Sequence, residues 1–221
     1  MSVINKNRFI KQHIELYGNE LFFEFAPNLN IKDALLKNSV LEDFESLVEC
    51  CMKCELGKSR KNFVFGSGDK NADLLIVGEA PGDYEDEKGK PFVGKAGKLL
   101  DKILKAIGLS RNKNVYITNI LKCKTPNNRD PLLSEINNCN SYLLKQIELI
   151  KPKIIIALGK VSGKSLLNKD LSLNDMRSHL REFNSIPLKV TYHPISLLND
   201  SSLKKNAWED FQVVRDFLNR S

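Results

Sequence analysis

The sequence predicts an α/β fold in which a parallel β-sheet carries helices on both faces. Four short apolar runs end abruptly in turn residues, a pattern that is typical of buried parallel strands. The segments between them place apolar residues three and four positions apart, which indicates amphipathic helices. Because strands and helices alternate, the strands are expected to lie parallel, with helices on both sides of the sheet.

The first half of the chain supplies two of these strands. A short strand and turn are expected over residues 64–68, and the first core strand over residues 73–77. A helical pattern then extends over residues 96–107, and glycine follows where that helix should end. The second core strand is expected over residues 115–118.

The second half repeats the alternation. A helix is expected over residues 134–150 and the third strand over residues 154–158, with another helix after Gly159. The fourth strand, residues 188–192, is stopped by a His-Pro pair, and a last helix is centred on residues 208–217.

The chain has 221 residues, of which 42% are hydrophobic, and this suffices for one compact domain with a sizeable core. We expect that domain over residues 46–221. Residues 1–45 are expected to form a helical N-terminal extension, because apolar residues such as Phe9 and Tyr17 recur there at helical spacing.

The net charge is +7, and the whole positive excess lies after residue 45. This distribution favours a face that binds a polyanion, although a lysine-rich genome would also raise the lysine count. No apolar stretch approaches the roughly 18 residues that span a membrane. The N-terminus lacks the apolar segment of a signal peptide, so we expect a cytoplasmic protein.

The loop that follows the first core strand is the expected functional site. Open α/β sheets bind ligands just past the carboxyl ends of their strands, and this loop lies at such an end. It carries five acidic side chains, at Glu79, Asp83, Glu85, Asp86 and Glu87. The alternative for most of these acids is a solvated surface loop.

The cysteines have the spacing of a metal centre. Cys51 and Cys54 form a CxxC pair, and Cys123 and Cys139 follow later in the chain. Four thiolates satisfy either tetrahedral zinc or a [4Fe–4S] cluster, and the pattern does not decide between them. Cys50 is an alternative to Cys51, although the two-residue gap favours Cys51. Without a secretory signal, a disulfide framework is not expected.

The segment Gly-Lys-Val-Ser-Gly-Lys-Ser, residues 159–165, looks like a phosphate-binding P-loop but departs from that motif. The P-loop needs four residues between its glycines, and this segment has three. Leu158 stands where the first glycine belongs. Nucleotide binding is therefore not expected, but the backbone N–H groups of this turn are candidates for contacting a DNA phosphate.

Three sequence blocks resemble the family-4 (type a) uracil-DNA glycosylases. Gly-Glu-Ala-Pro-Gly at 78–82 and Pro-Phe-Val-Gly at 91–94 are similar to the first motif of that family, Tyr-Ile-Thr-Asn-Ile-Leu-Lys-Cys at 116–123 to the second, and Thr-Tyr-His-Pro at 191–194 to the last. The four cysteines fall at its cluster-ligand positions. The resemblance implies a three-layer α/β/α sandwich on a four-stranded parallel sheet, and a [4Fe–4S] cluster held by Cys51, Cys54, Cys123 and Cys139.

The resemblance also implies how a base is bound. A uracil must leave the duplex before its glycosidic bond can be reached. Phe92 would stack on the flipped-out uracil, and Asn119 would bond its Watson–Crick edge. The loop glycines and alanine of the first motif belong to the same substrate-binding set, at Gly78, Ala80 and Gly82.

The chemistry follows from the same resemblance. His193 would stabilise the departing uracil anion by hydrogen bonding. Glu79 or Glu85 would position the attacking water and stabilise the cationic sugar, and the sequence leaves both carboxylates open for this role.

DNA contacts are expected on two surfaces. Residues 193–198 also resemble the family's loop that enters the minor groove, which implies that Leu197 or Leu198 is the wedge that fills the gap left by the flipped base. Phosphate contacts, which are mostly independent of sequence, are expected from Lys122, Lys124, Arg129, Lys164, Lys204 and Lys205.

The sequence thus predicts a monomeric, monofunctional uracil-DNA glycosylase of base excision repair. It would remove uracil from single- and double-stranded DNA and leave an abasic site. The alternative is a non-catalytic iron–sulfur module that binds nucleic acid.

Overall fold

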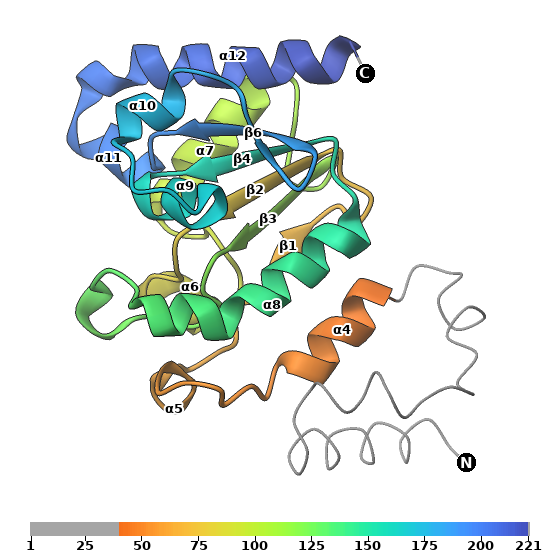
Figure 1. Cartoon of the computed structure of the whole chain (residues 1–221), viewed down its shortest axis with the longest axis vertical. Coiled ribbons are helices and arrows are strands. Elements are labelled where there is room, and N and C mark those ends of the chain that lie inside the picture. The colour runs from red at the N-terminus through yellow and green to blue at the C-terminus, as the bar shows by residue number, and fades with distance from the viewer. Residues whose placement is uncertain (1–39, 221) are drawn as a thin grey trace. The chain divides into compact units, whose positions relative to one another are not determined.

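The computed structural model describes residues 40–220 (Figure 1). The expected helical extension over residues 1–45 therefore lies almost wholly outside the described residues, and only helix α4 (Val40–Val48) overlaps it. The domain division at residue 46 stays a prediction. From Cys51 onward the described chain forms one compact unit.

A six-stranded sheet with the order β1-β3-β2-β4-β6-β5 forms the centre of this unit. Its four inner strands are parallel, as predicted: β3 (Val115–Asn119), β2 (Leu74–Gly78), β4 (Ile154–Leu158) and β6 (Ile186–Thr191). The two edge strands, β1 (Ser67–Gly68) and β5 (Arg181–Phe183), are short and antiparallel. Strand β1 falls within the predicted strand and turn at residues 64–68, whereas β5 was not predicted. Strand β5 forms a hairpin with β6 through Asn184 and Ser185, both at positive φ.

Helices cover both faces of the sheet and complete the expected three-layer α/β/α sandwich (Figure 1). On one face, α7 (Lys95–Ala106) and α12 (Lys204–Arg220) pack on β2, β3 and β4 through one apolar cluster that includes Leu100, Leu104 and Phe211. On the other face lie α8 (Leu133–Ile150) and α9 (Lys160–Leu167). A hydrogen bond from Thr118 Oγ1 to Gln146 Oε1 (3.1 Å) joins β3 to α8.

Short helices make up the remaining connections: α5 (Leu56–Ser59), α6 (Asp83–Lys88), η1 (Pro126–Asn128), α10 (Leu173–Arg177), α11 (Pro194–Asn199) and η2 (Ser201–Leu203). Helix α6 occupies the acidic segment that was expected to be loop. It ends at Gly89 in the left-handed conformation (φ 67°), and its acidic first turn suits a helix N-terminus. No helix within residues 40–220 is long and apolar enough to cross a bilayer.

A buried charge cluster lies between β6 and α12. The Asp210 carboxylate is 4% exposed and accepts hydrogen bonds from Arg177 (2.8 Å) and from the Thr191 hydroxyl (2.6 Å). Lys189 lies 3.0 Å from its other oxygen. The Arg177 guanidinium also stacks 4.3 Å from the Tyr192 ring centroid. The cluster therefore holds the carboxyl end of β6, from which the His193 turn departs.

Candidate functional site

A cavity of about 780 Å³ opens at the carboxyl edge of the parallel strands. Segments that follow β2, β3, β4 and β6 contribute to its wall, as the topology of a parallel sheet requires. Seven of the predicted substrate-binding and catalytic residues line it: Glu79, Ala80, Gly82, Glu85, Phe92, Asn119 and His193. Gly78, the eighth, lies against Phe92: a Cβ at position 78 would come within 2.6 Å of the Phe92 ring.

Phe92 forms the floor of the cavity in an unusual backbone conformation. Its φ is 53°, a left-handed value that costs a non-glycine residue about 1–3 kcal/mol. Arg111 holds this conformation by donating to the Phe92 carbonyl (2.7 Å) and the Pro91 carbonyl (3.1 Å). The Arg111 Nε in turn donates to Asp101 (2.7 Å). Gly97 is required here, because a Cβ would lie 1.7 Å from the Phe92 oxygen.

Glu85 holds the backbone just after Phe92. Its Oε1 accepts hydrogen bonds from the Val93 and Gly94 amides, both at 2.9 Å. Its Oε2 lies close to Gly82, where a Cβ would come within 2.9 Å. One oxygen of Glu85 is therefore committed to shaping the cavity.

Glu79 also lies in the cavity wall, but its carboxyl group is not held by hydrogen bonds as that of Glu85 is. Its carboxyl accepts no hydrogen bond from the part of the chain that the structure describes, and it is half-buried. Burial, with a smaller contribution from the nearby charge of Asp130, raises the pKa of Glu79 to about 7. Glu79 is thus a carboxylate with a near-neutral pKa and a free proton-accepting oxygen.

Asn119 ends β3 in the wall of the cavity. The residue is 2% exposed, and its Oδ1 is a buried acceptor without a partner among the described residues. Gly78 is its partner in the β2–β3 register, and a Cβ there would lie 2.3 Å from that oxygen. Leaving such an acceptor unpaired costs about 1–3 kcal/mol, so the site is suited to a ligand that donates an N–H.

His193 stands beside Phe92, with the two ring centroids 5.5 Å apart at an angle of 33°. Burial lowers the pKa of His193 to about 4, and the charge of Glu85 opposes this only in part. The Ile195 amide donates to Nδ1 at 3.2 Å, which leaves the proton of the neutral ring on Nε2. His193 is therefore a neutral hydrogen-bond donor at physiological pH.

This protonation state can be checked directly. In a pH titration followed by NMR, the His193 ring is expected to protonate near pH 4 and to show a neutral Nε2–H tautomer from pH 5.5 to 8. A His193 midpoint above pH 6 would contradict the assignment.

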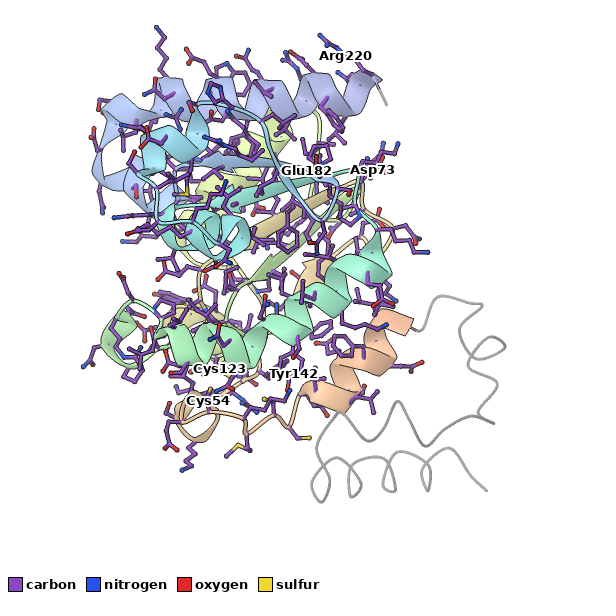
Figure 2. The ribbon with its side chains drawn as sticks, viewed as in Figure 1. Cys54, Asp73, Cys123, Tyr142, Glu182 and Arg220 are labelled. Atoms are coloured by element: carbon purple, nitrogen blue, oxygen red, sulfur yellow. The ribbon has the colours of Figure 1, made fainter. Side chains whose placement is uncertain are left out.

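A second site gathers the four predicted cysteines. Cys51, Cys54, Cys123 and Cys139 line one small pocket, and Figure 2 shows Cys54 and Cys123 together near Tyr142, below helix α8 in this view. Cys50 is exposed and does not line it. Within residues 40–220, no three potential ligands converge closely enough to hold a single metal ion.

The sulfur atoms in this pocket receive hydrogen bonds from the protein. The Lys53 amide lies 3.5 Å from the sulfur of Cys51, the Lys122 amide lies 3.4 Å from that of Cys139, and the Arg60 guanidinium lies 3.3 Å from that of Cys123. Burial raises the pKa of the Cys123 thiol to about 12. Buried thiols near a cation and amide donors are a suitable environment for thiolates bound to a metal cluster.

Comparison with known proteins identifies the family. The model of the uracil DNA glycosylase superfamily matches residues 65–212. The chain belongs to this superfamily. This agrees with the resemblance found in the sequence and with the observed fold.

Several relatives within the superfamily are similar over most of their length. The type-4 uracil-DNA glycosylase of Saccharolobus solfataricus is 45% identical over 77% of this chain and 83% of its own. That of Archaeoglobus fulgidus is 41% identical over 79% of this chain and 91% of its own. That of Thermotoga maritima is 36% identical over 83% and 97%.

Two residues expected at a glycosylase's DNA surface are buried instead. The Lys122 side chain is fully buried, and its Nζ donates to Thr118 Oγ1 (2.6 Å), the Asn119 carbonyl (2.8 Å) and Gln146 Oε1 (2.7 Å). The structure thus contradicts Lys122 as a phosphate contact, because three acceptors hold its ammonium group in the core. Leu197 is 2% exposed, whereas Leu198 is 45% exposed, so only Leu198 remains a candidate wedge.

Two of the other proposed phosphate contacts, Arg129 and Lys164, are engaged in ion pairs. Arg129 donates to both oxygens of Glu135, at 2.9 and 2.6 Å, and Lys164 pairs with Asp170. Both cations stay partly exposed, so their contact with DNA stays a prediction.

Some residues of the cavity were not predicted as site residues. Lys95 and Lys160 are exposed and line it, but Lys95 was not singled out, and Lys160 lies in the segment 159–165 that was considered only for its backbone N–H groups. Each follows a glycine that precedes a helix, at Gly94 and Gly159. A lysine at the first position of a helix that follows a strand or turn was the sequence feature that could have predicted both residues at the site. Tyr84 also lines the cavity and was not singled out.

Proposed function

We propose that this protein is a monofunctional uracil-DNA glycosylase of base excision repair, which hydrolyses the N-glycosidic bond of a flipped-out uracil. The observation that carries the proposal is the meeting of the unpaired Asn119 amide with Phe92 and His193 in one cavity. The names of its type-4 relatives support the same activity.

Base recognition would use Phe92 and Asn119. Extruding a base costs a few kcal/mol, which stacking and edge contacts in the pocket offset. Phe92 would supply the stacking face. The Asn119 Oδ1 would accept the N3–H of uracil, and its Nδ2 would donate to O4. Cytosine has no N3–H and carries a donor in place of O4, so the same amide would disfavour it.

Bond cleavage would develop negative charge on the base and positive charge on the sugar. As the bond between C1′ and N1 breaks, its electron pair goes to the uracil ring, and the His193 Nε2–H would stabilise the resulting anion at O2. A neutral donor suits this role, because it need not lose its proton.

Glu79 is our choice for the residue that activates water. The water oxygen would attack C1′, and its proton would pass to the Glu79 carboxylate, which also stabilises the cationic sugar. Two observations favour it over Glu85: Glu79 has a free carboxyl with a raised pKa, and Glu85 is bound to the Val93 and Gly94 amides.

The decisive experiment is a uracil-release assay. Purified protein should liberate free uracil from single-stranded DNA and from a U·G duplex without cutting the strand until alkali is added. Thymine- and cytosine-containing oligonucleotides are the controls. Binding of uracil DNA with no release would favour the alternative, a non-catalytic iron–sulfur module.

We propose that Cys51, Cys54, Cys123 and Cys139 hold a [4Fe–4S] cluster, which would cross-link the chain and take no part in the reaction. Four thiols line one pocket, and amide or guanidinium donors lie near three of their sulfur atoms, which supports a cluster held by cysteine. Protein purified without oxygen is expected to contain iron and acid-labile sulfide in equal amounts and to absorb visible light.

Replacing a cluster ligand tests the assignment. Cys139→Ser is expected to lose most of the iron and to lower the melting temperature, because metal binding contributes to folding free energy. Cys50→Ser is the matched control and should keep both, since Cys50 is exposed. Zinc in place of iron in the intact protein would contradict the proposal.

We further propose that the protein acts as a monomer in the cytoplasm on single- and double-stranded DNA. Leu198 remains the proposed wedge, and Lys124, Arg129, Lys164, Lys204 and Lys205 remain proposed phosphate contacts. The exposed cavity lysines Lys95 and Lys160 join them.

A further inference from the structure

Tyr84 is an exposed aromatic side chain at the mouth of the cavity. It is 67% exposed and lies among the lining residues on the α6 side. Within residues 40–220, no hydrogen bond, stacked ring or cation holds its side chain. The fold itself therefore gives Tyr84 no evident role.

The helix that carries Tyr84 is held firmly. The Asp86 carboxylate accepts hydrogen bonds from the Lys61 amide (3.0 and 3.1 Å) and the Asn62 amide (3.3 Å). The neighbouring acids of α6 are paired as well, Asp83 with Lys124 and Glu87 with Lys61. The Tyr84 ring therefore projects from a helix whose position is already fixed. Because little backbone motion is lost when a ligand stacks on the ring, the conformational entropy cost of binding is small.

The surroundings of Tyr84 suit a nucleic-acid strand. Lys95 and Lys160 are exposed along the same cavity and offer charges to phosphates. Ile195, 46% exposed, adds a second apolar side chain to the lining. Cations interleaved with apolar and aromatic side chains are the pattern by which proteins bind single strands, because every base has a face that can stack.

We propose that Tyr84 is a stacking platform for an unpaired base that flanks the uracil in single-stranded DNA. The proposal rests on the proposed glycosylase function and adds a second base site beside the Phe92 floor. In a duplex the flanking bases remain stacked on their own neighbours, whereas in a single strand they are free to stack on the protein. Tyr84 therefore favours single-stranded substrates.

Steady-state kinetics test the proposal. Tyr84→Ala is expected to raise KM for single-stranded uracil DNA about tenfold, with kcat unchanged, because one stacked base is lost. Tyr84→Phe and Tyr84→Trp keep a ring and should retain the original KM. The U·G duplex should change little with any of the three. Leu180→Ala, which truncates an exposed apolar side chain away from the cavity, is the control.

A binding measurement separates this inference from the glycosylase function. In a Glu79→Gln background, the fluorescence of 2-aminopurine beside the uracil should be quenched with Tyr84 present and not with Tyr84→Ala. Equal quenching in both, or an equal KM change on duplex and single strand, would overturn the proposal. A protein that releases no uracil from any DNA would instead overturn the proposed function, while quenching would still report on Tyr84.

Discussion

Replacing Glu79 by glutamine is expected to lower kcat for uracil release about 10²- to 10⁴-fold, the usual contribution of a positioned general base. In the unmodified protein the rate should rise with pH and level off above about 7, because the ionised carboxylate is the active form. The residual rate of Glu79→Gln should lack this dependence. Single-turnover kinetics from pH 5.5 to 9 measure both effects.

The same substitution has a predictable effect on stability. Folding raises the pKa of Glu79 from 4.5 to about 7, so the folded state increasingly loses stability as pH rises between these values. Glutamine avoids that loss. Glu79→Gln should therefore melt at a higher temperature than the unmodified protein at pH 8 and not at pH 4.

A matched control lies on the same segment. Glu87 is exposed and paired with Lys61 outside the cavity, so Glu87→Gln should keep full activity. If Glu79→Gln kept most of its activity while Glu85→Gln lost it without a change in melting temperature, Glu85 would be the base.

Removing the Asp210 carboxylate is expected to cause the largest loss of stability. Asp210→Ala would leave Arg177 and Lys189 buried without their counter-charge, which typically costs about 3–5 kcal/mol. In a protein of this size that corresponds to a fall in melting temperature of roughly 6–20 °C. Denaturant unfolding and calorimetry measure the change.

Two further variants make this prediction specific. Asp170→Ala breaks an exposed ion pair with Lys164 and should cost at most about 1 kcal/mol. Adding Lys189→Met to Asp210→Ala removes one of the stranded charges and should recover part of the loss. A loss in Asp210→Ala no greater than in Asp170→Ala would contradict the account.

The parallel sheet and the cavity were predictable because their signals are local. Runs such as residues 154–158 are apolar throughout, which matches strands buried on both faces. The carboxyl ends of parallel strands meet at one edge, so the motifs after β2, β3 and β6 had to converge. Asn119 and His193 lie there for this reason.

The buried charges were not predictable, because their partners are distant in sequence. Lys122 follows a strand and was expected at the surface, but its acceptor Gln146 lies 24 residues away on α8. Asp210 meets Arg177 across 33 residues. No local pattern distinguishes such a lysine or aspartate from an exposed one. The β5–β6 hairpin had a local signal in Asn184-Ser185, but Pro187 in the following strand obscured it.

The left-handed backbone of Phe92 restricts how this position can evolve. The residue types that adopt such a φ most readily are glycine, asparagine, aspartate and histidine, and none of them offers the phenyl face of phenylalanine. Selection of a library at position 92 for thermal stability should therefore enrich glycine and asparagine, whereas selection for uracil release should return aromatic residues. A phenylalanine at position 92 therefore makes the folded domain less stable than it could be. Arg111 and Glu85 offset part of this loss of stability, because they hydrogen-bond to the Phe92 carbonyl and to the Val93 amide.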